Sequence, residues 1–284
     1  MGFSDTDWQA LAAAMHRLEA PGFAGRMTTL VGRPAELAAR ALPGAAAGLV
    51  AKAAETALTR ALDVALYSLR DTRWGGGRVM HSTLASASGA VGGAFGIAAV
   101  TIELPVSTAI MLRAIAAIAR EEGEDLADPA TRLACLEVFG LAHGGGLSGS
   151  GPGAAETEGG YFAARALLTR GLARAADAIM NKGSLHGSSA LALRALSPIV
   201  NRFGAVVIQK FAAQAVAVVG AVGGAAINLA FVEHFQEVAR GHFTMRRLER
   251  KYGAEAVRAE YDRLRIAERT LQPPRIAAIS KGMC

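Results

Sequence analysis

The sequence is poor in charge, in aromatic side chains and in cysteine, and the shortage of cysteine excludes a disulfide-rich class of protein. Of its 284 residues, 19% are charged, 6% are aromatic and 52% are hydrophobic, whereas an average soluble domain has roughly 25% charged and 45–50% apolar residues. The two cysteines, Cys135 and Cys284, do not form the framework of a disulfide-stabilised secreted domain. With a mean hydropathy of +0.29, the composition lies between that of a soluble and that of an integral membrane protein.

The chain also lacks the motifs of common catalytic and cofactor sites. The glycine run 75–77 is not followed by the Gly-Lys-Ser/Thr of a P-loop. Ser148 and Ser150 lie in a loop rich in glycine and serine, 143–160, and not in the strand–turn–helix elbow that holds a catalytic serine. We therefore expect no cofactor and interpret the protein as non-catalytic.

The N-terminal sequence leads us to expect no secretory signal. Acidic residues stand at positions 5 and 7, where a signal peptide has basic residues, and no apolar core segment follows them. We expect a cytoplasmic protein that attaches peripherally to the inner membrane.

Two long stretches without any Asp, Glu, Lys or Arg are the most informative feature of the chain. They span 79–102 and 211–232, and both contain the hexapeptide Gly-Ala-Val-Gly-Gly-Ala, at 89–94 and 220–225. Each places glycines four residues apart, which on a helix make a groove for a closely packed second helix. Their length would suffice to span a bilayer, but their Ser, Gln, Asn, Thr and Gly content favours a buried helical hairpin.

Alanine abundance and apolar spacing of three and four predict an all-α fold. We expect a single multi-helix domain over 1–271, built around the two glycine-rich segments, with the loop 143–160 inside it and a C-terminal tail over 272–284. Asp5 and Thr6 suggest the cap of a first helix. The expected helices cover 5–19, 34–42, 43–70, 79–102, 105–120, 130–142, 161–180, 189–202 with a break near Ser197-Pro198, 211–250 and 254–272.

Asn228 begins a stripe of residues that share one face of its predicted helix. Phe231, Phe235 and His242 follow on the same face, whereas Glu237 lies on another. A buried amide needs hydrogen-bond partners. Asn228 therefore either bonds a neighbouring helix and fixes packing, or marks the polar end of an apolar pocket. On the second interpretation, the predicted ligand-binding residues are Gly92, Gly96, Gly220, Gly224, Asn228, Phe231 and Phe235.

The six histidines do not follow a metal-binding pattern. No His-Glu-x-x-His occurs, and His234 and His242 point about 80° apart on one helix. A metal site would need a distant residue such as Glu103, which is more simply a carboxylate at a helix N-terminus. We predict no metal, and the candidates that remain for one are Glu103, His234, Glu237 and His242.

Positive charge is concentrated at the C-terminal end. Residues 240–284 carry 11 basic and 5 acidic side chains, which accounts for the whole net charge of +6. This segment would attract anionic headgroups or an acidic partner. Alternatively it is a solvated helix with pairs three residues apart, at Glu255/Arg258, Glu260/Arg263 and Asp262/Arg265. Without an aromatic platform or a helix-turn-helix, we predict no nucleic-acid binding.

Several of these segments resemble the EcsC family. The similarity covers about 45–255 and is carried by 217–228, by His234-Phe235-Gln236, by 239–249, and by Glu103-Leu104-Pro105 with Arg113 and Arg120. The resemblance implies a connection with an ABC transporter linked to secretion and competence. It supplies no catalytic residues, and nothing in this chain resembles a protease site.

We therefore expect a membrane-associated EcsC-like protein that binds lipid or another apolar small molecule at the inner-membrane surface. Its partners would be that ligand, the membrane through the basic C-terminal helix, and a membrane transporter. Two alternatives stay open: a helical hydrolase or metal-dependent enzyme using Glu103, His234, Glu237 or His242, and a structural adaptor for a membrane complex.

Overall fold

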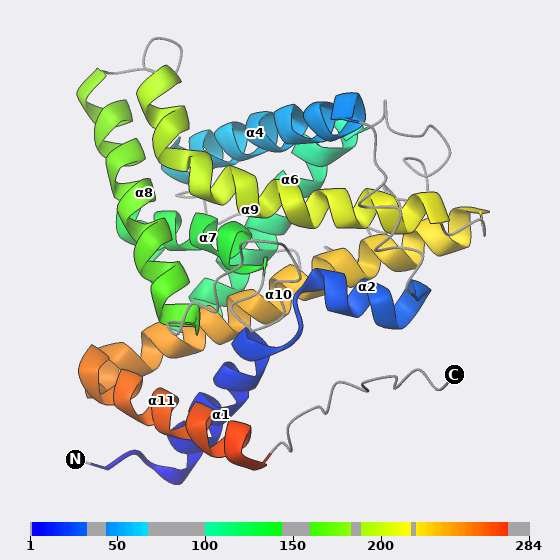
Figure 1. The fold of residues 1–284 in the computed structure, drawn as a ribbon. Helices are drawn as coiled ribbons and strands as arrows, with labels where there is room; N and C mark the ends of the chain where they lie inside the picture. The colour runs from blue at the N-terminus through cyan, green and yellow to red at the C-terminus, as the bar shows by residue number, and fades with distance from the viewer. Residues whose placement is uncertain are drawn as a thin grey trace, which may run out of the picture.

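The computed structural model describes residues 2–32, 44–67, 100–143, 160–182, 189–216 and 220–271, and every regular element within these ranges is an α-helix. The predicted all-α class is confirmed. The helices, labelled in Figure 1, are α1 (Asp5–Glu19), α2 (Phe23–Val31), α4 (Gly44–Tyr67), α6 (Val100–Glu121), α7 (Pro129–Leu141), α8 (Gly160–Lys182), α9 (Ser189–Val216), α10 (Gly220–Tyr252) and α11 (Ala254–Leu271).

Helix α10 runs diagonally through the fold and organises it. It contacts α2, α6, α7 and α9, and its C-terminal part contacts α1 and α11, which come from opposite ends of the chain (Figure 1). Gly253, with φ +88°, ends this helix by donating its N–H to the carbonyl of Glu249 at 2.9 Å. Glycine adopts this left-handed conformation without steric cost, which separates α10 from α11 as the sequence predicts.

The centre of the fold is an aromatic cluster. Phe139 of α7, Phe203 of α9 and Phe235 of α10 have ring centroids 5.2–5.7 Å apart. Phe231 lies one turn before Phe235 and connects this cluster to Phe23 of α2 at 5.4 Å. All five rings are fully buried, so the aromatic residues, though few, are concentrated where four helices meet.

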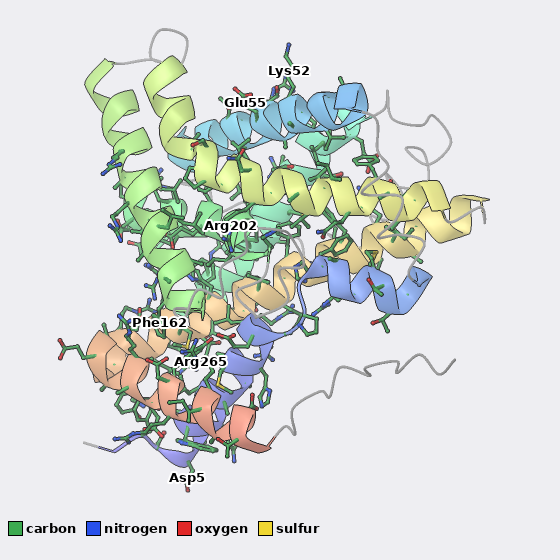
Figure 2. The ribbon with its side chains drawn as sticks, in the orientation of Figure 1. Asp5, Lys52, Glu55, Phe162, Arg202 and Arg265 are labelled. Atoms are coloured by element: carbon green, nitrogen blue, oxygen red, sulfur yellow. The ribbon has the colours of Figure 1, made fainter. Side chains whose placement is uncertain are left out.

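Helix α4 illustrates how apolar spacing positions a helix. Ala53, Ala57 and Leu58 are buried against the bundle, and the helix contacts α6 and α9. Lys52 and Glu55 point away from the bundle on the outer face (Figure 2). This division of faces is the pattern of an amphipathic helix at the surface of a globular core.

Two predicted helix boundaries at prolines are wrong. Helix α6 begins at Val100, so Pro105 lies inside it and does not open a new helix. Pro198 lies inside α9, which runs from Ser189 to Val216 without the predicted break. Figure 1 shows α9 bent between a first part beside α8 and a longer part beside α4. An interior proline costs about 3 kcal/mol, and packing against these two neighbours compensates for it.

The second chargeless stretch contributes to two helices and not to one. Its residues 211–216 end α9, and 220–232 begin α10, while 217–219 lie outside the described residues. Most of the first stretch, with Gly92 and Gly96, also lies outside them. None of the described helices is both long enough and apolar enough to cross a bilayer.

Helix α1 packs very closely on α10 at Gly241. A Cβ atom at this position would lie 2.8 Å from Cγ of Leu18 and 3.2 Å from the carbonyl oxygen of Ala14. A glycine is therefore required for this helix crossing. The N-cap of α1 is Ser4, whose hydroxyl accepts a hydrogen bond from the Asp7 N–H, and not Asp5 or Thr6 as predicted.

Candidate functional site

The predicted stripe on α10 is present and entirely buried. Asn228, Phe231, Phe235 and His242 have no exposed surface, whereas Glu233 is exposed. Phe235 contacts the rings of three other phenylalanines. Phe231 and Phe235 therefore form part of the protein's own core. Of the predicted groove glycines on this helix, Gly220 is its first residue and Gly224 is buried one turn later.

A buried ion pair joins α6 to α9 beside this stripe. Nζ of Lys210 donates a hydrogen bond of 2.6 Å to Oε1 of Glu103, and the two side chains are 0% and 6% exposed. Glu103 lies in the first turn of α6, and Lys210 lies near the C-terminal end of α9. Burying two charges costs several kcal/mol per ion, and their mutual attraction offsets this only with good geometry.

The surroundings of the pair are mainly apolar. Nζ of Lys210 lies 4.9 Å from the ring centroid of Phe231 and 5.4 Å from that of Phe211. Burial lowers the pKa of Lys210 below its usual value, although the Glu103 carboxylate opposes this shift. The ammonium is thus held in a region of low polarity by a single carboxylate and two aromatic rings.

Two polar atoms of α6, one in the pair and one a turn after it, have unused hydrogen-bonding capacity. Oε2 of Glu103 is buried without a hydrogen-bond partner among the described residues, and so is Oγ of Ser107, one turn later on α6. Asn228 lies one turn before Phe231 on α10 and so shares the face that meets Lys210. We call Glu103, Ser107, Lys210 and Asn228 the polar cluster.

The polar cluster belongs to one end of the bundle. It draws on the N-terminal parts of α6 and α10 and on the C-terminal part of α9, which lie toward the right of Figure 1. Val106 of α6, three residues after Glu103, is 51% exposed. An apolar environment with a few convergent polar groups is the composition of a small-molecule site.

A second buried network surrounds His242. The Tyr161 hydroxyl lies 2.8 Å from Nδ1 of His242, whose Nε2 lies 3.6 Å from Oε2 of Glu137. Thr169 donates a hydrogen bond of 2.7 Å to the other oxygen of Glu137. Burial raises the pKa of Glu137 and lowers that of His242, which favours the uncharged form of each.

The order carboxylate, imidazole, hydroxyl is that of a catalytic triad. Here, however, the three groups come from α7, α10 and α8 and are at most 4% exposed. They connect three helices in the interior, and burial raises the pKa of the Tyr161 hydroxyl, which makes it a poor nucleophile. We therefore assign this network to packing.

The four candidates for a metal site are not brought together. Glu103 pairs with Lys210, and Nε2 of His234 lies 2.6 Å from the carbonyl oxygen of Ala142. Glu237 pairs with Arg17 and Arg240 on the surface. Within the described ranges, no three His, Cys, Asp or Glu residues are grouped so that they could hold a metal ion.

The positive charge of the C-terminal segment is largely compensated by acidic residues of the described fold. Glu124 pairs with Arg246 and Arg250, and Asp7 pairs with Arg247 and Lys251. Helix α11 itself carries four basic and four acidic residues. Two of its predicted pairs are confirmed, Arg263 with Glu260 at 3.0 Å and Arg265 with Asp262 at 3.4 Å, whereas Arg258 lies 4.0 Å from Asp262. Attachment to an anionic surface through this segment stays a prediction.

A comparison with protein families decides the relationship that the sequence suggests. The sequence model of the EcsC protein family matches residues 27–248. The chain belongs to this family. Comparisons with curated proteins and with solved structures give no match. The EcsC match includes the polar cluster and leaves out α1 and α11.

Lys210, Ser107, Tyr161 and Glu137 were not predicted as site residues. For Lys210 a signal exists in the sequence: it is the only charged residue between Arg202 and Glu233. Glu103 is likewise the only charged residue between Arg78 and Arg113. Two isolated charges of opposite sign, each beside a chargeless stretch, indicate a buried pair. Tyr161 and Glu137 have no comparable signal, because helical spacing alone does not bring α7, α8 and α10 together.

Proposed function

We propose that this EcsC protein is a non-catalytic binding protein for a lipid or another amphiphilic molecule, acting at the cytoplasmic surface of the inner membrane. The observation that carries the proposal is the buried pair of Glu103 and Lys210, with its unused hydrogen-bonding capacity. Well-packed hydrophobic residues generally stabilise a core as much as a buried ion pair does. A buried ion pair in so apolar a place is therefore a candidate for a role in binding.

The environment of the pair supports an amphiphilic ligand. Phe211 and Phe231 border Lys210, and in the sequence a chargeless stretch of more than 20 residues adjoins each member of the pair. Such surroundings favour an acyl chain or a similar apolar group, while the polar cluster orients its polar end.

We further propose that the protein supports a membrane transporter. The EcsC resemblance implies a connection with an ABC transporter and secretion, and a soluble lipid-binding protein at the membrane surface could support such a transporter. Neither hydrolysis nor metal chemistry is proposed, because the candidate residues for both are held apart by separate partners.

The first experiment is lipid extraction from protein purified without detergent. We expect co-purified lipid with the wild type and its loss from the double variant Lys210→Met/Glu103→Leu, which removes both charges together. The control is Arg165→Met/Glu249→Leu, which removes an ion pair elsewhere in the fold. The charged atoms of that pair are 2.7 Å apart, and its side chains are 18% and 15% exposed. Wild-type protein that yields no lipid would contradict the proposal.

Membrane fractionation separates the proposal from its alternatives. We expect wild-type protein in the membrane fraction at low salt and its partial release at high salt, because surface electrostatics are screened. An adaptor would bind the membrane only when its partner is present and would contain no lipid. A hydrolase would lose activity on His242→Gln, and lipid turnover by the wild type would contradict a non-catalytic role.

A further inference from the structure

The Glu103–Lys210 pair has both a spare acceptor and spare donors. Oε2 of Glu103 accepts no hydrogen bond from the described residues. Lys210 carries three N–H donors, and Glu103 is the only described residue that accepts from it. The rings of Phe211 and Phe231 also lie beside its ammonium group. The two unused capacities lie on directly bonded partners, so one small group can meet both.

The chemistry of that group follows from this combination. A hydroxyl donates one hydrogen bond and accepts others, so it can donate to Oε2 of Glu103 and accept from Nζ of Lys210. A phosphate or carboxylate only accepts, and it would meet the negative charge of Glu103 in a poorly screened interior. An ammonium group only donates, and it would meet the charge of Lys210. The pair as a whole is neutral and attracts neither ion.

Ser107 extends the site along α6. It lies four residues after Glu103, therefore on the same helical face, and its buried Oγ has no partner among the described residues. A second hydroxyl on the ligand would bond to this serine. Phe231 is buried and its ring lies 4.9 Å from Nζ of Lys210, so it supplies apolar surface beside these groups.

From this geometry we infer that the polar cluster binds a neutral lipid through hydroxyl groups, the class represented by mono- and diacylglycerols, and not an anionic phospholipid. This inference rests on the proposed lipid-binding function and specifies its ligand. Hydrogen bonds to charged groups contribute about 1.5–3 kcal/mol each. One such bond corresponds to about a tenfold or greater preference for a hydroxylated lipid.

The test compares three probes with the same acyl chain on delipidated full-length protein. Monoolein carries two hydroxyls, methyl oleate carries none, and oleate carries a negative charge. We expect monoolein to bind at least about tenfold more tightly than either of the others, measured by native mass spectrometry. Equal binding of monoolein and methyl oleate would overturn the inference and leave lipid binding intact. Failure of all three to bind would overturn the proposed function itself.

Substitutions in the polar cluster test whether it causes the preference for monoolein over methyl oleate. In Lys210→Met/Glu103→Leu, monoolein should lose its advantage and bind as weakly as methyl oleate. Ser107→Ala, which removes one hydroxyl without leaving a buried charge, should reduce the preference several-fold. Thermal unfolding verifies that each variant is folded. A tenfold preference that persists in the double variant, or a preference for oleate in the wild type, would overturn the assignment. Water has the same hydrogen-bonding capacity, and a site filled by water alone would give no preference.

Discussion

Removing one member of the Glu103–Lys210 pair should destabilise the protein much more than removing both. The side chains are 0% and 6% exposed, so Lys210→Met leaves a buried carboxylate without its partner, and Glu103→Leu leaves a buried ammonium. Either change should lower the free energy of unfolding by about 3–5 kcal/mol. In the double variant no charge is left behind, and the expected change is near zero or stabilising by about 1–4 kcal/mol.

The assay is urea unfolding followed by far-ultraviolet circular dichroism, analysed as a double-mutant cycle. The two single losses should exceed the double loss by a coupling free energy of at least about 3 kcal/mol. Unchanged dependence on urea concentration would show that the variants expose the same surface on unfolding. The matched surface control is Arg263→Ala. Arg263 pairs with Glu260, and its side chain is 76% exposed. This substitution should change the free energy of unfolding by less than about 1 kcal/mol.

If the losses in the free energy of unfolding from the two single substitutions simply add in the double variant, this reasoning is refuted. If each single variant lost less than about 1 kcal/mol and the double variant lost their sum, the two charges would be hydrated and independent in solution. The pair would then not be buried, and both proposals for this site would lose their foundation.

Three further predictions concern other parts of the fold. Burial lowers the pKa of His234 from 6.5 to about 4. The unfolded chain therefore binds more protons in this window, and stability should fall by up to about 3 kcal/mol as the pH drops through it. His234→Gln should remove this loss from the pH profile, and an unchanged profile would contradict it. Despite its burial, Glu124 has a pKa lowered from 4.5 to about 2, chiefly by Arg246. Glu124→Gln should cost about 2 kcal/mol at neutral pH, and the cost should disappear as the pH falls toward 2; a pH-independent cost would argue against the ion pairs. Gly241→Ala should cost about 1–3 kcal/mol in thermal or urea unfolding, because the new Cβ would meet Leu18 and Ala14. The control Gly48→Ala, with nothing within 4 Å, should stabilise α4 by about 0.5–1 kcal/mol, and equal effects at both glycines would contradict the close helix crossing.

The helical class and the buried stripe on α10 could be predicted because both depend on spacing within one helix. Asn228, Phe231, Phe235 and His242 follow the period of 3.6 residues, and all four are buried. The position of Gly253 as a helix end could be predicted for a similar reason, since glycine is favoured in the left-handed conformation that ends a helix.

Helix boundaries at prolines could not be predicted from local preference. Pro198 removes one hydrogen bond, but neighbouring helices on both parts of α9 stabilise the helix through tertiary packing. The cap at Ser4 shows the same limit on a smaller scale. Three consecutive residues, Ser4, Asp5 and Thr6, are all suitable caps, and the hydrogen bond to Asp7 selects the first of them.

The polar cluster could be predicted in part. The sequence predicts Glu103 as a helix-terminal carboxylate, which it also is, but its partner is 107 residues away in the sequence. No periodicity links positions on different helices. Only the isolation of each charge beside an apolar stretch indicates the pairing, because a lone charge in a buried segment needs a counter-charge.

The most direct test of the account is native mass spectrometry of the wild type and of Lys210→Met/Glu103→Leu, both purified from cells without detergent. The account predicts that the wild type carries an additional mass of one lipid molecule, which is released on collisional activation, and that the folded double variant has the mass of the polypeptide alone. Identical spectra for the two proteins, with or without bound lipid, would contradict the claim that the Glu103–Lys210 pair is a binding site.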